Sequence, residues 1–71
     1  MTDWPAYAKG IMRSEMTRKG LSYADLVKAL DGIGVKESEA NLRNKVSRGS
    51  FTAAFLFQCM SAMGVKTLHL D

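Results

Sequence analysis

The chain has 71 residues, of which 46% are hydrophobic and 24% are charged, and its net charge is +3. This length allows one domain over residues 1–71, and this composition excludes a disordered tail. The single cysteine excludes an internal disulfide.

Two features of the sequence bear on location. The N-terminal segment MTDWPAYAKG lacks the basic and apolar regions of a signal peptide, so a cytoplasmic location is expected. The longest weakly charged run, GSFTAAFLFQCMSAMGV, contains polar residues and is shorter than the ~20 apolar residues of a membrane span. We therefore expect no membrane partner.

The positive charge is unevenly distributed. Six of the seven acidic residues lie at or before Glu39, and the seventh is Asp71. The intervening segment, residues 40–70, contains four Lys and Arg residues and no acid. This distribution favours a polyanionic partner, although an ordinary solvated surface explains the charge equally well.

Two helices are predicted in the first half of the chain. Asp3 is a suitable N-cap for a helix over residues 3–19, in which apolar residues recur at helical spacing until a glycine. Ser22 and Asp25 form a capping-box pattern at the start of a second helix, which ends near Asp31.

A glycine-rich turn, DGIGV, follows the second helix. Gly32 and Gly34 are free to adopt positive φ angles, while Ile33 and Val35 are expected to hold the turn against the core. The turn lacks the Gly-Lys-Ser/Thr sequence of a phosphate-binding loop.

Two further helices complete the predicted fold. The third covers about residues 36–47, and Gly49 is placed for a left-handed C-terminal cap. Ser50 or Thr52 then caps a fourth helix, which ends at Gly64. The sequence therefore predicts a compact all-α, four-helix domain.

Helical spacing also predicts the core. Val65 and Leu68 are expected to fold back on the bundle, and four methionines are interpreted as core filler in preference to a partner groove. These methionines are Met12, Met16, Met60 and Met63. The inward stripe of the fourth helix is predicted to contain Ala53, Leu56, Phe57, Met60 and Met63. The residues predicted to meet in one core are Trp4, Leu26, Leu30, Leu42, Val46, Leu56, Phe57 and Met60.

Residues suited to catalysis or metal binding are scarce. His69 is the only histidine and Cys59 lies on an apolar helix, and neither has an evident base nearby in the sequence. One Cys and one His cannot complete a tetrahedral zinc site. We therefore expect no enzymatic activity, no small-molecule substrate and no metal or other cofactor.

The third helix presents a polar face. When Leu42 and Val46 point inward, a helical step of about 100° per residue directs an amide-rich stripe outward. The stripe contains Glu37, Asn41, Asn44 and Arg48, with Ala40 and Ser47 beside it.

Arg43 and Lys45 lie on opposite flanks of that stripe. Such a helix suits the major groove of DNA, because Asn can bind adenine bidentately while cations at the sides meet the phosphates. A polar helix face without a ligand explains the pattern as well.

The segments RKGLSYADLVKAL and GVKESEANLRNKVSRGSFTAAFLFQCMSAMGV resemble the helix-turn-helix domain of the phage-repressor, Cro and C1-type family. In that family Gly-Leu-Ser opens the second helix, Gly-Val precedes the recognition helix, and an apolar-x-x-Gly pattern ends it. The matching residues are Gly20, Leu21, Ser22, Leu26, Leu30, Gly34, Val35, Val46, Gly49, Thr52, Leu56, Ala62, Met63, Gly64 and Val65. The sequence also resembles a family of short bacterial proteins known only as a domain of unknown function.

The first resemblance implies a lambda-repressor-like domain that binds double-stranded DNA without catalysis, as in a bacterial or phage transcriptional regulator. By position, Ser22 and Tyr23 at the start of the second helix would contact phosphates. The base-facing positions would be Ala40, Asn41 and Asn44. The residues that neutralise further phosphates would be Arg43, Lys45 and Arg48.

Other interpretations stay open. The residues Asp31-Gly32-Ile33 enlarge the turn relative to the family, which can tilt the third helix away from groove docking. The family often forms twofold dimers, so Phe51 and Phe55 are candidates for a homodimer contact, unless they pack on the first helix. The alternative function is an antitoxin-like adaptor with the same fold that binds a protein and no DNA.

Overall fold

The computed structural model describes residues 2–68 and 70, which fold into four helices. They are α1 (Trp4–Lys19), α2 (Tyr23–Asp31), α3 (Glu39–Arg48) and α4 (Ala53–Ala62). The described residues contain no strand, which confirms the predicted all-α fold. None of these helices is both long and apolar enough to cross a bilayer.

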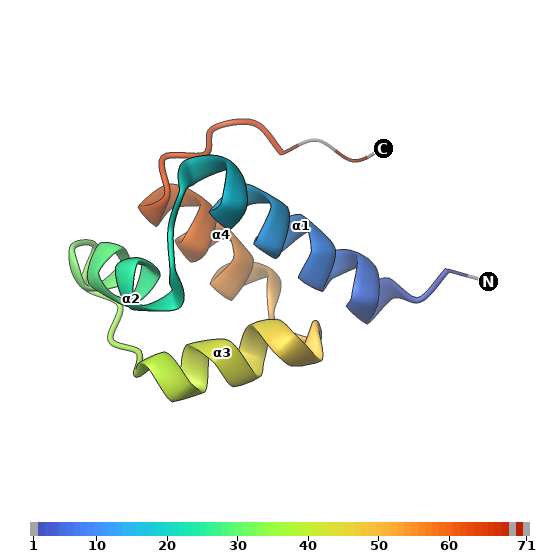
Figure 1. Cartoon of the computed structure of the whole chain (residues 1–71), viewed down its shortest axis with the longest axis horizontal. Coiled ribbons are helices and arrows are strands. Elements are labelled where there is room, and N and C mark those ends of the chain that lie inside the picture. Colours follow the sequence, from blue (N-terminus) through green and yellow to red (C-terminus); the bar gives the residue numbers. More distant parts are fainter. Residues whose placement is uncertain (1, 69, 71) are drawn as a thin grey trace.

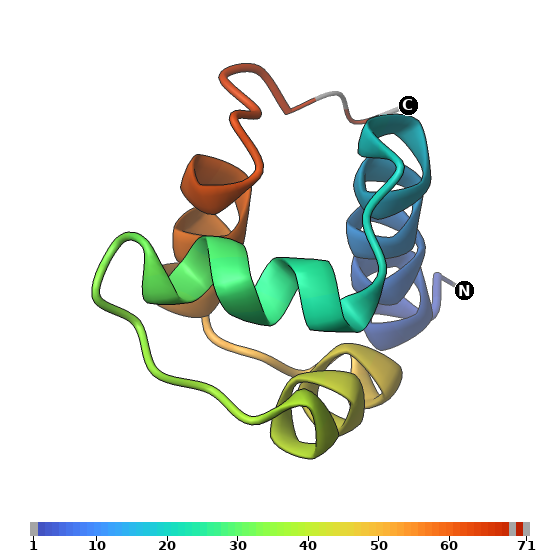
Figure 2. The same ribbon diagram turned by 60° about the vertical axis from the view of Figure 1, so that its left-hand side comes forward.

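The arrangement leaves α3 at one side of the molecule. It packs against α1 and α2, while α2 also packs against α4. Figures 1 and 2 show the C-terminal tail on the opposite side from α3 and a wide connection between α2 and α3. One long face of α3 is therefore left uncovered by other helices.

Each helix begins at a side-chain cap, and two of these caps confirm predictions from the sequence directly. The Asp3 carboxylate accepts a hydrogen bond from the Ala6 N–H, and Ser22 forms a capping box with Asp25. The Thr52 hydroxyl accepts from the Phe55 N–H at 3.0 Å. Such caps contribute about 1 kcal/mol each.

The predicted start of the third helix was wrong by about three residues. The helix begins at Glu39, because the hydroxyl of Ser38 accepts a hydrogen bond from the Asn41 N–H at 3.1 Å and caps it. Residues 36 and 37 consequently belong to the connection, and the helix continues to Arg48. Glu37 is therefore not part of the outward stripe.

The glycine-rich turn agrees with the prediction only in part. Gly34 has φ 81°, as expected, but Gly32 has φ −62° and extends the right-handed end of α2. Val35 is half-buried and its N–H donates to the Leu30 carbonyl at 2.9 Å, whereas Ile33 is exposed. Val35 alone therefore holds the turn to the core.

A single apolar core lies between the helices. Its buried members are Met12, Met16, Leu26, Leu30, Leu42, Val46, Phe55, Cys59, Met60 and Met63. The prediction of four core methionines is confirmed, and Val65 and Leu68 pack against the core as expected.

The inward face of α4 differs from the predicted one. Phe55 and Cys59 are buried, whereas Phe57 is 64% exposed and Leu56 is half-buried. Trp4 is also outside the core, with 68% of its surface exposed. The apolar residues of α4 continue around most of its circumference, so helical spacing alone did not distinguish the two faces.

Candidate nucleic-acid interface

The outward face of α3 has the residues predicted for it. Leu42 and Val46 are fully buried and fix the rotation of the helix against the core. The remaining predicted positions are exposed, and they are Ala40, Asn41, Asn44, Ser47 and Arg48. The structure thus brings two amides and one arginine together on one accessible surface.

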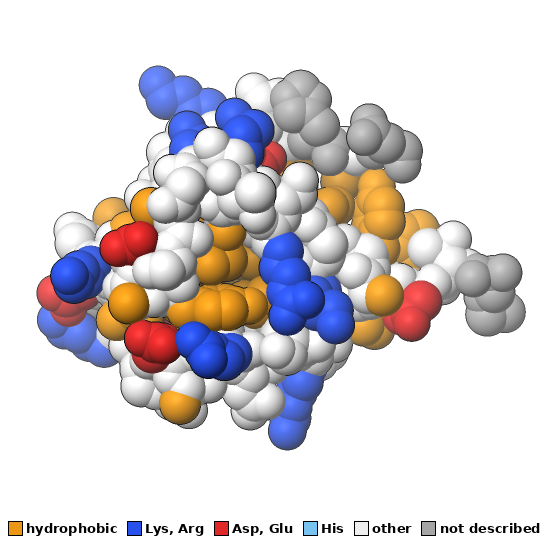
Figure 3. Space-filling model, in the orientation of Figure 1, with side chains coloured by type: hydrophobic (Ala, Val, Ile, Leu, Met, Phe, Trp, Pro, Cys, Tyr) orange, Lys and Arg blue, Asp and Glu red, His pale blue; other side chains and the backbone are white. Residues whose placement is uncertain are grey.

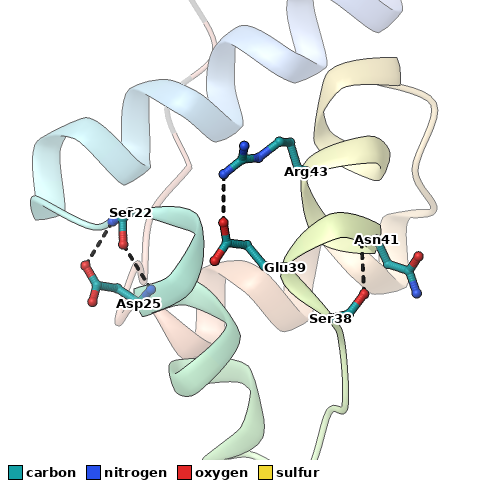
Figure 4. A network of polar contacts seen from close by, with 6 residues as sticks. All are labelled: Ser22, Asp25, Ser38, Glu39, Asn41 and Arg43. Carbon is teal, nitrogen blue, oxygen red and sulfur yellow. Dashed lines mark hydrogen bonds and ion pairs between the residues drawn. The ribbon is translucent and has the colours of Figure 1, made fainter.

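Arg43 lies on one flank of this surface. Its Nη2 donates to the Glu39 Oε2 at 2.8 Å, and its guanidinium carbon lies 5.0 Å from the centroid of the Tyr23 ring. Figure 4 shows the side chain crossing the space between α3 and α2. Both contacts are at least partly exposed, so the ion pair contributes at most about 1 kcal/mol.

Lys45 lies on the other flank and is more firmly bound to the protein. Its Nζ is 2.5 Å from the Glu37 Oε2 and 4.9 Å from the centroid of the buried Phe55 ring. The Glu37 side chain is only 10% exposed, whereas that of Lys45 is 45% exposed. The enlarged connection thus supplies a carboxylate that draws Lys45 towards α4.

The start of α2 does not offer the two phosphate contacts that the family resemblance implied. The Tyr23 hydroxyl is buried and has no hydrogen-bond partner among the described residues, so this hydroxyl is not accessible to a phosphate in this conformation. Ser22 is exposed, and its hydroxyl accepts from the Asp25 N–H at 3.1 Å.

Asp25 further changes this helix start. Hydrogen bonds from the backbone N–H and the side chain of Ser22 lower the pKa of the Asp25 carboxyl below its usual range. The group is therefore an anion at neutral pH, and it occupies the helix end where a phosphate would bind.

The two phenylalanines proposed for self-association pack together inside the domain. Their ring centroids are 5.6 Å apart, with Phe55 buried and Phe51 half-buried. The two rings do not form an exposed patch, because the Phe55 ring belongs to the core, so the condition for the predicted self-association is not met. The alternative, that the two rings pack on α1, stays a prediction.

Two of the grooves that border α3 lie beside its flanking cations. One lies between α1, the start of α2 and α3, and contains Arg13, Thr17, Ser22 and Arg43 among its lining residues. The other contains Lys45, Arg48, Ser50, Phe51, Thr52 and Phe55. Figure 3 shows Lys and Arg side chains beside an apolar hollow on the face that it draws.

Arg13 was missed by the sequence reasoning, which considered α1 only for its apolar residues. Its position directly after the buried Met12 indicates that it lies at the edge of the packed face of α1. The neighbour that it approaches depends on how α1 crosses α3, which the local pattern does not specify.

The buried thiol of Cys59 shows no sign of reactivity. Burial, and secondarily the nearby Glu37 carboxylate, raise the pKa of the Cys59 thiol to about 12. The group is consequently protonated at neutral pH, as expected for a core cysteine. The expectation for His69 concerns a residue outside the described part of the chain.

The fold and this surface define a small all-α domain with one exposed, amide-rich helix between basic flanks. The chain belongs to a protein family described as a domain of unknown function (DUF6471), whose family model matches residues 4–68. No curated protein and no solved structure matches the chain. The resemblance to a domain of unknown function is thereby confirmed, and the family assigns no activity.

Proposed function

We propose that this chain is a non-catalytic, helix-turn-helix-like domain that binds duplex DNA, and that it acts as a small transcriptional regulator in the cytoplasm of a bacterium or its phage. The observation that carries the proposal is the outward face of α3. Asn41, Asn44 and Arg48 are exposed there, while Leu42 and Val46 are fully buried on the opposite side.

The chemistry of this face suits the DNA major groove. Asn side chains can donate to and accept from adenine at once, and Arg can bind guanine or phosphate bidentately. Arg43 and Lys45 stand on opposite flanks, where a docked helix meets the two phosphate strands. The positive charge between residues 40 and 68 supports the same partner.

The contacts of the flanking cations are compatible with this proposal to different degrees. To bind a phosphate, Arg43 has to break its exposed ion pair with Glu39. The cost in free energy is small, because such pairs contribute about 0.2–1 kcal/mol. Breaking the ion pair between Lys45 and Glu37 would leave the mostly buried Glu37 carboxylate without a partner, so release of Lys45 costs more free energy. We therefore assign the main phosphate contacts on α3 to Arg43 and Arg48.

The enlarged connection between α2 and α3 is accommodated by the domain. The two helices still pack against each other, and Leu26, Leu30 and Leu42 share the same core. A helix pair therefore supports the outward face of α3, as a recognition helix needs.

The test is binding of the chain to a random-sequence duplex at low salt, measured by fluorescence anisotropy, followed by selection of a preferred site. Asn44→Ala should lose about 1–3 kcal/mol on the preferred site and nothing on random duplex. Gln58→Ala is the matched control, because it removes an exposed amide from α4. A wild-type chain without duplex affinity at low salt would refute the proposal.

A protein-binding adaptor is the second candidate function, and one observation favours it. Trp4 and Phe57 are largely exposed, and an apolar groove runs beside Trp4 between α1, α4 and the C-terminal tail. Its lining residues include Ile11, Leu56 and Leu68. If duplex affinity is absent, a Trp4→Ala variant that loses a protein partner would support the adaptor.

A further inference from the structure

The groove between α1 and α3 brings together two arginines from distant parts of the sequence. Arg13 extends from α1 and Arg43 from α3, and both line the same groove with the hydroxyl-bearing residues Thr17 and Ser22. Figure 4 shows Arg43 directed towards α1 and the start of α2. The groove therefore offers two forks of N–H donors to one ligand.

The charges in this groove are not balanced. Arg43 shares the carboxylate of Glu39, whereas Arg13 is exposed and has no acidic partner among the described residues. Asp25, the acid at the neighbouring start of α2, is not among the residues that line the groove. Two guanidinium groups thus stand beside one available carboxylate, which leaves a net positive charge that an anion would neutralise.

The neighbouring start of α2 offers no alternative place for that anion. Asp25 places a carboxylate there, and the Tyr23 hydroxyl is buried. The Tyr23 ring lies beside the Arg43 guanidinium, with 5.0 Å between the guanidinium carbon and the ring centroid, so it supports the arginine without presenting its own hydroxyl.

We propose that Arg13 and Arg43 together bind a phosphodiester of the DNA strand on this flank of α3, in place of the phosphate contacts expected from Tyr23 and the start of α2. Guanidinium forks match phosphate oxygens bidentately, and two of them can hold one phosphate from both sides. This assignment rests on the proposed DNA-binding function and adds Arg13, on α1, to its surface.

The experiment compares wild type with Arg13→Ala, Arg43→Ala and Tyr23→Phe on a random-sequence duplex between about 50 and 200 mM salt. The matched control is Lys66→Ala, which also removes one positive charge but belongs to the tail beyond α4. Figure 1 shows this tail on the opposite side of the molecule from α3. Circular dichroism melts check that the variants are folded, as expected for the exposed Arg13.

Each lost phosphate contact lowers the salt slope of log K by about 0.9, so the affinity loss over this salt range should shrink by about 3-fold in Arg13→Ala and in Arg43→Ala. Tyr23→Phe and Lys66→Ala should keep the wild-type slope. Suppose that wild type binds duplex and Arg43→Ala binds more weakly, but that Arg13→Ala has the same affinity and salt slope as Lys66→Ala. This result would refute the arginine pair and leave the proposed function standing. Reduced binding in Tyr23→Phe alone would return the contact to α2, whereas a wild type that binds no duplex would overturn both proposals.

Discussion

Gly49 ends α3 at a place where no side chain fits. Its φ is 67°, its surface is buried, and its N–H donates to the carbonyls of Lys45 and Val46. A Cβ added at this position would lie 1.9 Å from the carbonyl oxygen of Pro5 and 2.6 Å from its carbonyl carbon. The end of α3 and the first turn of α1 are therefore in direct backbone contact.

Gly49→Ala should for this reason be destabilising in two ways. The left-handed conformation costs a non-glycine residue about 1–2 kcal/mol, and the clash with the Pro5 backbone should add an overpacking cost of about 1–3 kcal/mol. The sum, about 2–5 kcal/mol, is a large fraction of the total stability of so small a domain.

Gly20→Ala is the matched control. Gly20 also caps a helix in the left-handed conformation, with φ 68°, but an added Cβ would meet nothing within 4 Å. Gly20→Ala should therefore lower the free energy of unfolding only by the cost of the left-handed conformation, about 1–2 kcal/mol. Because 1 kcal/mol shifts the Tm of such a domain by about 4–8 °C, the two variants should differ by at least about 4 °C.

Urea and thermal unfolding followed by circular dichroism would measure both variants. Equal destabilisation of Gly20→Ala and Gly49→Ala would contradict the close approach of Gly49 to Pro5. Wild-type stability of Gly49→Ala would also contradict the left-handed cap at this residue.

Three more outcomes follow from local contacts. Ser38→Ala should cost about 1 kcal/mol in urea unfolding by removing the cap of α3, whereas Ser47→Ala on the exposed face should be close to neutral; equal values would contradict the cap. Since the folded-state pKa of Asp25 lies below its ordinary 3.8, its capping contribution should be complete above that pH and decline as pH falls through the folded-state pKa. Acid unfolding of Asp25→Asn should accordingly lose this part of the pH dependence, and an unchanged profile would argue against it. Cys59, whose pKa is raised to about 12, should react slowly with a thiol reagent at pH near 8 until denaturant is added, and rapid native labelling would show an accessible thiolate.

The helix ends that depend on neighbouring residues could be predicted from the sequence. Asp3 and Ser22 cap α1 and α2 through residues three positions away, so a short segment contains all the required information. The start of α3 was missed because Glu37 also suits the first turn of a helix, whereas capping by Ser38 places Glu37 beside Lys45 in the folded chain. The preference for Ser38 as the cap therefore involves the contact between Glu37 and Lys45, which lie eight residues apart in the sequence.

The buried face of α4 could not be predicted from spacing. Phe55 and Phe57 both belong to acceptable apolar stripes, and only packing against the rest of the bundle buries the first and exposes the second. For α3 the same method succeeded, because Leu42 and Val46 are the only large apolar residues of that helix.

The candidate site also has features that could be predicted from the sequence and features that could not. Exposure of Asn41 and Asn44 follows from the burial of the two apolar residues, so it could be predicted. The ring contacts of Arg43 and Lys45, and the groove that Arg13 and Arg43 share, involve residues on different helices. They depend on crossing angles that the local sequence does not determine.

The opposed contacts of Arg43 and Lys45 have a mechanical consequence for α3. Arg43 is attached to the Tyr23 ring of α2 and Lys45 to the Phe55 ring of α4, so each contact opposes rolling of the helix in one sense. A substitution that removes one of the two ring contacts leaves the other unopposed, and the rotation of α3 is then held mainly by the fully buried Leu42 and Val46.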